Sequence, residues 1–430
     1  MGHCRCTLWL KQFIGKGGFM ITNNKVNPLI STVIAVLLLF IVIATVGCQS
    51  NVNSKPGVDS DNNNVEAVES KLYPILVDNK VGFIDELGKT VVTPKYSNSH
   101  DFNAGFCGVK LGDKWGFIDV QGKYIISPRF LEVGNFCEGM AGVIEDDKSG
   151  YIDQTGKILI DPQFEYAGDF SEGLAGVCSG GKCGFINKDA QIVIELKYDY
   201  VGTFSEGLAL VGFGNRYGFI DKGSNWVINP RYDDAGPFKD GLARVLQNGQ
   251  WGYIDKSGQT VIPPQFDKAS DFSEGMAFVS LNDKWGYIDK QAQIVIDYKF
   301  DDATHFSGSL AAVKSGEKWG YINKTGQQVI SPQYDEADPF AGELALVWKY
   351  IPSREVAQMN YIDKSGKTIW SLELKESDVL DLIDDAEEEV DKQDTSSHSD
   401  AAIENQDFTS SYDYEAAGDN YDYDEEYDDY

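Results

Sequence analysis

The sequence predicts an all-β repeat protein, and two observations lead to that prediction. A motif of Gly, Phe or Tyr, Ile, and Asp or Asn recurs every 34 residues. Its glycines are Gly82, Gly116, Gly150, Gly184, Gly218, Gly252, Gly286 and Gly320. The composition agrees, because 44 Gly and 12% aromatic residues suit strands joined by tight turns. A ninth, degenerate copy is Asn360–Asp363, with its six extra residues assigned to a loop at Ile351–Arg354.

Residues at fixed distances from the motif glycine define the rest of the repeat. Ile stands two residues after it, Val or Ile ten after it, Phe twenty after it and Val twenty-seven after it. A period of 34 also suits helical tetratricopeptide arrays. The local pattern excludes that reading, because short β-branched and aromatic runs interrupted by Gly do not form helices.

Each unit is predicted to be a three-stranded antiparallel meander. In the sixth unit the strands are Leu242–Val245, Trp251–Asp255 and Thr260–Ile262. Asp255–Gly258 fits a type I turn, with Asp at its first position and Gly at its fourth. Pro263-Pro264 is expected to end the third strand, because proline has no N–H to donate.

Nine such units fill an array predicted at residues 71–370. A single unit buries too little to fold alone, so neighbouring units must stack. Closed propellers usually have about four to eight blades. Nine units therefore favour an open β-solenoid, with a closed, propeller-like ring as the alternative.

The motif and its surroundings resemble the WG-repeat family, also called the KWG-repeat family. The residues that carry this resemblance are Lys114–Asp119, Trp251–Asp255, Lys284–Asp289 and Lys318–Asn323. Other copies depart at the Trp position, where Val81, Ser149, Cys183 and Tyr217 stand. The resemblance implies a repeat architecture with a binding role, and it brings no catalytic motif.

The amino-terminal residues indicate export. An uncharged apolar run, Leu29–Gly47, ends at Cys48 in a sequence that resembles the lipobox of bacterial lipoproteins. Residues 20–48 are therefore interpreted as a lipoprotein signal peptide with Cys48 lipidated, or as an uncleaved membrane anchor. Residues 1–19 are interpreted as a mis-annotated upstream extension, because Lys16-Gly17-Gly18 before Met20 can be encoded by a ribosome-binding sequence. Both readings place the array on the extracytoplasmic face of the bacterial membrane, in the cell envelope.

Two polar segments flank the array. Residues 49–70 are predicted to be a flexible linker. Residues 371–430 form an acidic tail, disordered by composition, with a possible short helix at 373–392. The tail holds 23 Asp and Glu against 2 Lys, a net charge of −21, whereas the whole chain has −30. No basic cluster suggests a nucleic-acid partner.

Four tryptophans are the candidate ligand-binding residues. Trp115, Trp251, Trp285 and Trp319 each precede a motif glycine. Facing outward, they would form an aromatic ladder for sugar rings or peptides. Facing inward, they would belong to the core, which is the favoured interpretation. The glycine beside each ring suggests close packing of the next unit.

Other candidates for chemistry have structural readings as well. Cys178 and Cys183 flank a predicted hairpin loop and are either a disulfide or two small strand residues. The recurring Asp of the motif is expected to cap a turn rather than to bind calcium. His100 and His305 are expected to face solvent. The sequence shows no catalytic, cofactor or metal motif.

These observations predict a non-catalytic protein tethered at the cell envelope. Its expected partners are the membrane and an unknown envelope protein or cell-wall polysaccharide. One alternative is a structural spacer whose acidic Tyr/Asp tail makes the contacts. A further alternative, an enzyme with an unrecognised site, has the least support.

Overall fold

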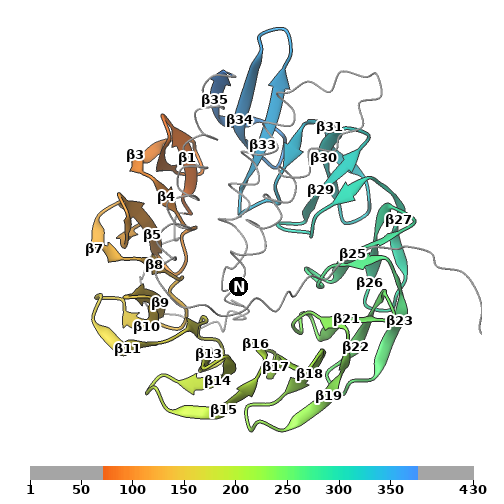
Figure 1. Ribbon diagram of the computed structural model, residues 1–430. Coiled ribbons are helices and arrows are strands. Elements are labelled where there is room, and N and C mark those ends of the chain that lie inside the picture. Colours follow the sequence, from red (N-terminus) through yellow and green to blue (C-terminus); the bar gives the residue numbers. More distant parts are fainter. Residues whose placement is uncertain (1–70, 376–430) are drawn as a thin grey trace, which may run out of the picture. The chain divides into compact units, whose positions relative to one another are not determined.

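The computed structural model describes residues 71–375, and these residues form nine antiparallel sheets, here called blades 1 to 9, arranged in a ring (Figure 1). Within this range the repeats contain strands and turns and no helix. Each of the nine predicted units forms one blade. The predicted open solenoid is wrong, because the ring closes, as the alternative proposed.

The first four blades contain fifteen strands. Blade 1 has β1 (Tyr73–Val77), β2 (Lys80–Ile84) and β3 (Thr90–Tyr96). Blade 2 has β4 (Asn98–Ser99), β5 (Phe106–Leu111), β6 (Lys114–Asp119) and β7 (Tyr124–Phe130). Blade 3 has β8 (Glu132–Val133), β9 (Met140–Glu145), β10 (Lys148–Asp153) and β11 (Ile158–Phe164). Blade 4 has β12 (Tyr166–Ala167), β13 (Leu174–Ser179), β14 (Lys182–Asn187) and β15 (Ile192–Tyr198).

The remaining five blades contain four strands each. Blade 5 has β16 (Tyr200–Ser205), β17 (Leu208–Phe213), β18 (Arg216–Ile220) and β19 (Trp226–Tyr232). Blade 6 has β20 (Asp234–Ala235), β21 (Leu242–Gln247), β22 (Gln250–Asp255) and β23 (Thr260–Phe266). Blade 7 has β24 (Lys268–Ala269), β25 (Met276–Leu281), β26 (Lys284–Asp289) and β27 (Ile294–Phe300). Blade 8 has β28 (Asp302–Ala303), β29 (Leu310–Ser315), β30 (Lys318–Asn323) and β31 (Gln328–Tyr334). Blade 9 has β32 (Glu336–Ala337), β33 (Leu344–Ile351), β34 (Val356–Asp363) and β35 (Thr368–Lys375).

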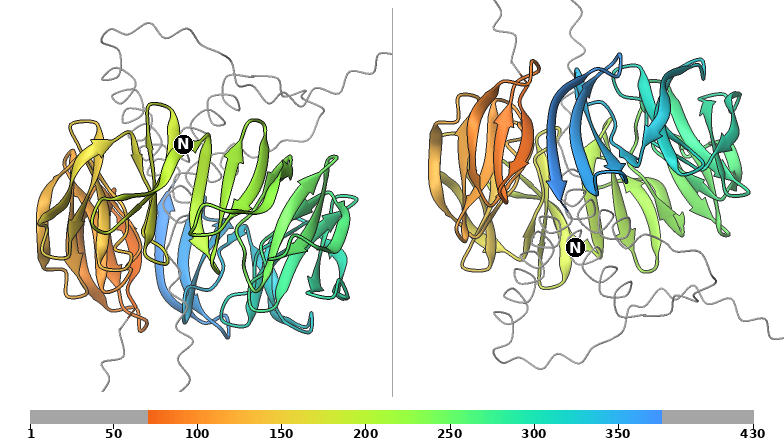
Figure 2. Two further views of the ribbon diagram at one scale, coloured as in Figure 1. Left: turned by 90° about the horizontal axis from the view of Figure 1, so that it is seen from below. Right: turned by 90° about the horizontal axis from the view of Figure 1, so that it is seen from above.

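Blades 2 to 9 each have one strand more than predicted. The extra strand comes first in the blade and lies innermost in the ring, and the last strand lies outermost (Figure 1). In most blades it is only two residues long, as in β24, which pairs Ala269 with Val279. A strand of two residues is too short to show an alternation of apolar and polar side chains, so this segment was predicted to be part of a connector. The side views show the strands running between the two faces of the ring (Figure 2).

The outermost strand continues through the prolines that were expected to end it. β23 runs to Phe266, past Pro263 and Pro264. Its pairing with β22 shifts register between Trp251 and Tyr253, which marks a β-bulge. An edge strand with a bulge accommodates proline, because no neighbour on that side needs the missing N–H.

The same bulge explains the glycine of the motif. A Cβ on Gly116 would lie 2.4 Å from the carbonyl oxygen of Ile126, and one on Gly252 would lie 2.5 Å from that of Ile262. The close neighbour is therefore the outer strand of the same blade, and the predicted approach of the next unit is wrong. No other residue leaves room for that carbonyl.

The Asp of the motif caps the turn that follows it. Asp255 accepts hydrogen bonds at Oδ1 from the N–H groups of Ser257 (2.9 Å) and Gln259 (3.0 Å). The N–H of Gly258 donates to the carbonyl of Asp255 at 2.9 Å, which closes the expected turn. Asn187 makes the same contacts in blade 4. These contacts support a turn-capping role.

The core lies between blades rather than in one central cluster. One face of blade 6, with Tyr253 and Ile262, packs against blade 7, and the opposite face, with Val245, packs against blade 5. The recurring Phe residues complete each interface, as when Phe272 of blade 7 meets the Tyr253 ring at 4.9 Å. Each blade is therefore stabilised mainly by its two neighbours.

Blades 1 and 9 close the ring through side chains and share no sheet. The Tyr361 hydroxyl donates to the carbonyl of Pro74 at 2.7 Å, and the Tyr73 hydroxyl accepts from the N–H of Glu343 at 3.2 Å. The rings of Tyr73 and Tyr361 lie 5.6 Å apart. Among the described residues, blade 1 has three strands and no short inner strand. The hydrogen bonds of Tyr73 and Tyr361 connect it to blade 9.

The six extra residues of the ninth repeat lengthen a hairpin instead of forming a loop. β33 and β34 have eight residues each, and they pair from Leu344 and Asp363 to Ile351 and Val356. The added length places Ala357 in one core with Leu72 and Leu76 of blade 1 and its border, and Trp348 and Met359, at ordinary repeat positions, lie in the same core. The insertion therefore enlarges the closing interface.

The array extends slightly beyond its predicted end. β35 continues to Lys375, so residues 373–375 of the range considered for a helix are strand. The rest of that range, the signal or anchor segment, the linker and most of the tail lie outside the described residues. In the described part of the chain, no helix is long and apolar enough to cross a membrane.

Candidate ligand-binding site on the inner wall

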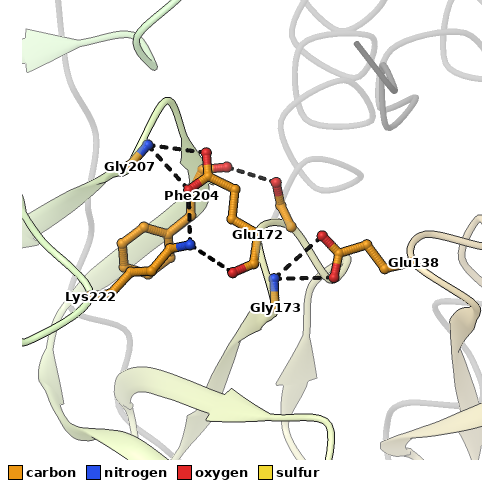
Figure 3. Close-up of polar contacts among 7 residues, drawn as sticks. Glu138, Glu172, Gly173, Phe204, Gly207 and Lys222 are labelled. Carbon is orange, nitrogen blue, oxygen red and sulfur yellow. Dashed lines mark hydrogen bonds and ion pairs between the residues drawn. The ribbon is translucent and has the colours of Figure 1, made fainter. Parts of the chain in front are cut away.

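Carboxylates clamp neighbouring blades together on the face that carries the capped turns. Glu172 of blade 4 accepts from the N–H of Gly207 in blade 5 at 3.0 and 3.1 Å (Figure 3). Lys222 of blade 5 lies 3.1 Å from that carboxylate and donates to the Glu172 carbonyl at 2.8 Å. Glu138 makes the same contact with Gly173 one blade earlier. Glu206, Asp240 and Glu274 repeat it at the next three junctions.

A second series of acids clamps the opposite face, where the hairpin tips lie. Asp199 follows blade 4 and accepts from Lys182 of that blade at 2.5 Å. Its other oxygen accepts from the N–H of Gly214 in blade 5 at 2.7 Å. Asp301 repeats this arrangement with Lys284 and Gly316. Many repeated charged residues therefore hold the ring together.

The tryptophans proposed as a ladder lie in the cores between blades. Trp115 and Trp319 are only 7% and 6% exposed, which leaves no free ring face for a ligand. Trp251 and Trp285 are half-buried, and other side chains cover them. The Arg244 guanidinium lies 5.0 Å from the Trp251 ring, and the Phe278 ring lies 5.3 Å from that of Trp285. The favoured reading of these residues as core therefore agrees with their positions.

Two tyrosines on the inner wall are exposed instead. Tyr166 and Tyr200 begin the innermost strands of blades 4 and 5, and their side chains are 45% and 46% exposed. The same position holds a polar residue in the other six four-stranded blades. Those residues are Asn98, Glu132, Asp234, Lys268, Asp302 and Glu336. Blades 4 and 5 therefore differ from the rest of the wall.

Small residues leave the tyrosine rings uncovered. A Cβ on Gly168 would lie 3.0 Å from the Tyr166 hydroxyl, and one on Gly202 would lie 3.7 Å from that of Tyr200. A side chain at Gly168 would crowd the Tyr166 phenol, and one at Gly202 would lie in van der Waals contact with the Tyr200 hydroxyl. Their absence keeps the surface beside both rings open.

A pocket of about 90 Å³ lies beside Tyr200, between blades 5 and 6. Its lining consists of Tyr200, Gly202, Thr203, Leu210 and Pro237. The Tyr217 ring braces Tyr200 from the other side, at 5.9 Å and 74°. The lining is mainly apolar, with Thr203 and Tyr200 as its two hydroxyl-bearing residues.

Acidic groups surround this aromatic surface. Burial raises the pKa of Tyr166, and the nearby Tyr200 and Asp169 raise it further. Burial also raises the pKa of Asp169 to about 6, against a lowering contribution from its hydrogen bond with Cys137. The pKa of Tyr200 is raised by burial and then by Tyr217 and Asp234. The surface therefore offers acceptor oxygens.

The cysteine and histidine candidates take part in the structure of the repeat array or lie exposed on it. The sulfurs of Cys178 and Cys183 lie 2.07 Å apart as a cross-strand disulfide between β13 and β14. His305 is exposed as expected. His100 is half-buried with its ring 4.6 Å from that of Trp115, so the solvent-facing expectation is wrong for it. Cys48 lies outside the described residues.

Among residues 71–375, no group of three or more His, Cys, Asp or Glu side chains is placed to hold a metal ion. The acids of the motif cap turns, and those of the connectors clamp blades. The arrangement on the inner wall is suited to binding through stacking and hydrogen bonds.

The sequence contains a signal for this site that lies outside the recurring motif. Aligned by the 34-residue period, only two of the eight copies have Tyr sixteen residues after the preceding motif glycine. The predicted ligand-binding residues were instead ones that recur, namely the Trp beside four of the motif glycines. Residues that build a fold recur in every copy, whereas a local site appears as a departure from the repeat.

Comparison with known proteins places the repeat in a family. The family described as "WG containing repeat" matches eight consecutive segments, residues 82–115, 115–148, 150–183, 184–217, 217–251, 251–285, 285–319 and 319–348. No curated protein matches the chain.

Solved structures show likeness in fold alone. One described as a eukaryotic initiation factor is similar at 10% identity and a TM-score of 0.52, over 71% of this chain and 97% of that one. Dihydro-heme d1 dehydrogenase NirN gives 12% identity and 0.41, over 75% and 76%. Hsv2p of Kluyveromyces lactis gives 10% and 0.34, over 65% and 97%. By its eight matched repeats, this chain belongs to the WG-repeat family.

Proposed function

We propose that this chain is a non-catalytic binding module held at the outer side of the bacterial cytoplasmic membrane. The ring is a rigid scaffold in which neighbouring blades are joined by cores and clamps. The observation that carries the proposal is the exposed pair Tyr166 and Tyr200, beside a pocket on the inner wall. Exposed aromatic rings with little structural role are typical of binding surfaces.

The ligand is proposed to be an envelope protein or a cell-wall polymer. A sequence with an apolar run before Cys48 supports the envelope location. The second candidate function is that of a spacer whose tail makes the contacts. The net charge of −21 in residues 371–430 favours it, because so acidic a segment attracts cationic partners.

A pull-down distinguishes these functions. The full chain and a variant ending at Lys375 are incubated with insoluble cell-wall material and with detergent-solubilised envelope extract. Retention that survives removal of the tail supports binding by the ring. Retention that disappears with the tail supports the spacer. Absence of any specific retention by either protein contradicts the proposal.

A further inference from the structure

The inner wall of blades 4 to 6 differs from the rest of the ring in its chemistry. Tyr166 and Tyr200 offer exposed rings where the other blades offer polar residues. The Tyr200 pocket has apolar walls from Leu210 and Pro237 and is only about 90 Å³ in volume. A pocket of this size accepts one small ring or the edge of a chain, and the adjacent Tyr166 extends the aromatic surface.

The polar groups around these rings are mostly acceptors. Asp169 neighbours Tyr166, and Asp234 neighbours Tyr200. Within blade 6, Arg244 is engaged, because its Nε donates to Asp271 at 2.7 Å and its Nη1 donates to the carbonyl of Ala269. The exposed Lys268 lies one blade farther along, in blade 7. The surface therefore favours a ligand that is rich in hydrogen-bond donors and carries no negative charge.

A sugar ring meets these requirements. One face of a pyranose presents C–H groups that pack on an aromatic ring, and its rim presents hydroxyls that donate to carboxylates. A polyproline segment also packs on tyrosine but has no donors, so it would leave the acceptors without partners. A polyanion would be repelled by the acids.

We propose that the inner wall of blades 4 to 6 binds an uncharged glycan, with Tyr166 and Tyr200 as stacking residues for successive sugar rings. Asp169, Asp234 and Thr203 flank the rings and accept or donate hydrogen bonds at the sugar hydroxyls. This inference rests on the proposed binding function and narrows it to one ligand class. It also explains why these tyrosines occur in neighbouring blades.

The test measures binding of defined probes to the full chain in detergent by calorimetry. The probes are hexamers of N-acetylglucosamine and of glucose, polygalacturonate as a polyanion, and a decaproline peptide. We expect binding of at least one neutral hexamer and none of the other two probes. Tyr166→Ala and Tyr200→Ala are each expected to weaken that binding about tenfold.

Matched variants separate stacking from other effects. Tyr200→Phe keeps the ring and is expected to retain most of the affinity. Asp302→Ala changes the same inner-strand position in blade 8 and is expected to leave affinity unchanged. Circular dichroism checks the folding of every variant.

Three results would overturn the glycan assignment. They are binding of decaproline or polygalacturonate in preference to the neutral hexamers, hexamer binding unaffected by both alanine substitutions, and no hexamer binding at all. The pull-down separates this failure from failure of the proposed function. If the ring still captures a specific envelope protein, the module function stands and the glycan assignment falls. If nothing is retained, both fall.

Discussion

Individual carboxylates act at three recurring positions, and each position has a separate structural task. Asp255 caps a turn within its blade, Glu172 clamps two blades on the turn face, and Asp199 clamps two blades on the tip face. All three accept backbone N–H groups, which are otherwise left without partners in turns and loops. Much of the acidity of the array therefore belongs to its scaffold.

The turn-capping acids predict a loss of stability in acid. Hydrogen bonds from the hydroxyls of Thr155 and Ser257 lower the folded-state pKa of Asp153 and Asp255. A lowered folded pKa stabilises the fold above the unfolded pKa, about 4 for Asp, and this contribution disappears as pH falls below it. The contribution of the capping acids should be nearly constant from about pH 8 to 5, and the melting temperature should fall below about pH 4. Asp169, whose folded-state pKa is raised to about 6, acts in the opposite sense and should raise stability slightly as pH falls from about 7 to 5.

Two blades supply the control for this prediction, because Asn187 and Asn323 occupy the capping position without a titrating group. A variant with Asp153→Asn and Asp255→Asn should therefore lose less stability between about pH 4 and 2 than the natural chain. Melting followed by circular dichroism across this range measures the difference. Equal losses in both proteins would exclude these aspartates as the cause.

The carboxylate clamp on the turn face leads to two predictions, that removing a clamp lowers the stability of the fold and that adding one raises it. Glu172→Ala removes a carboxylate that accepts the Gly207 N–H and pairs with Lys222, so the free energy of unfolding should fall by about 1 kcal/mol. Blade 2 has Ala104 at the equivalent position, already at a φ of 50°. Ala104→Glu combined with Gln154→Lys should create a new clamp and raise stability by about 0.5–1 kcal/mol. Urea unfolding measures both effects, and a destabilised double variant would refute the clamp geometry.

Within a blade, the sequence predicts some elements better than others. The second and third strands were predicted, because short runs of aromatic and β-branched residues such as Trp251–Asp255 recur in every copy. The outer strand was cut short at Pro263, since the rule that excludes proline applies to central strands and this strand lies at an edge. The inner strand Lys268–Ala269 has two residues and no pattern.

The candidate site was less accessible from the sequence. A Trp at the motif position and a Tyr at the inner-strand position are equally aromatic, and only the fold distinguishes them. Trp115 is buried between blades, whereas Tyr200 is 46% exposed. The closure of the ring determines which face of a short inner strand points to its centre. No local sequence pattern predicts that closure.

The disulfide between Cys178 and Cys183 is expected to contribute modestly to the stability of the fold. Cys178 and Cys183 enclose only four residues, so the chain-entropy model limits the gain to about 2 kcal/mol. The double substitution to Ser should therefore lower the free energy of unfolding by about 1–2 kcal/mol and leave the fold intact. Urea unfolding measures the loss. Alkylation of the unfolded, unreduced protein provides the check, because modification at both cysteines would show that the bond is absent in solution.

At the scale of the whole molecule, ring closure depends on contacts between distant parts of the chain. The same repeat forms every junction between consecutive blades from blade 1 to blade 9. The repeat pattern alone therefore does not distinguish an open solenoid from a closed ring. Closure is decided by the lengthened hairpin of blade 9 and by Tyr73 and Tyr361. Tyr361 is the aromatic residue of the ninth motif copy, whereas Tyr73 and the lengthened hairpin lie outside the repeat pattern. The solenoid was favoured because closed propellers usually have about four to eight blades and the sequence has nine units.

The ring should therefore open first at the junction of blades 1 and 9. Clamps of the Glu172 kind join the blades from 3 to 8. Blade 8 has Gly308 in place of the clamping acid. Blades 1 and 9 are the first and last of the array, so no connecting segment within residues 71–375 joins them as it joins the other neighbours. Hydrogen exchange should be faster in β1 and β33 than in β14 and β18, because neither a carboxylate clamp nor a connecting segment of the described residues opposes local opening at that junction.

Two matched substitutions test whether the closing tyrosine controls this opening. Tyr361→Phe removes the hydrogen bond to Pro74, and Tyr151→Phe removes the same kind of bond to Gly168 at a junction that Glu138 also clamps. Each bond contributes about 1 kcal/mol. In the described part of the chain, the junction of blades 1 and 9 has no carboxylate clamp, and only the bond from the Glu343 N–H to Tyr73 accompanies that of Tyr361. Tyr361→Phe should therefore speed exchange throughout β1 and β33, and Tyr151→Phe should have a smaller, local effect. Equal effects of the two substitutions would mean that the ring has no preferred opening point and that the junction of blades 1 and 9 is as strong as the clamped ones.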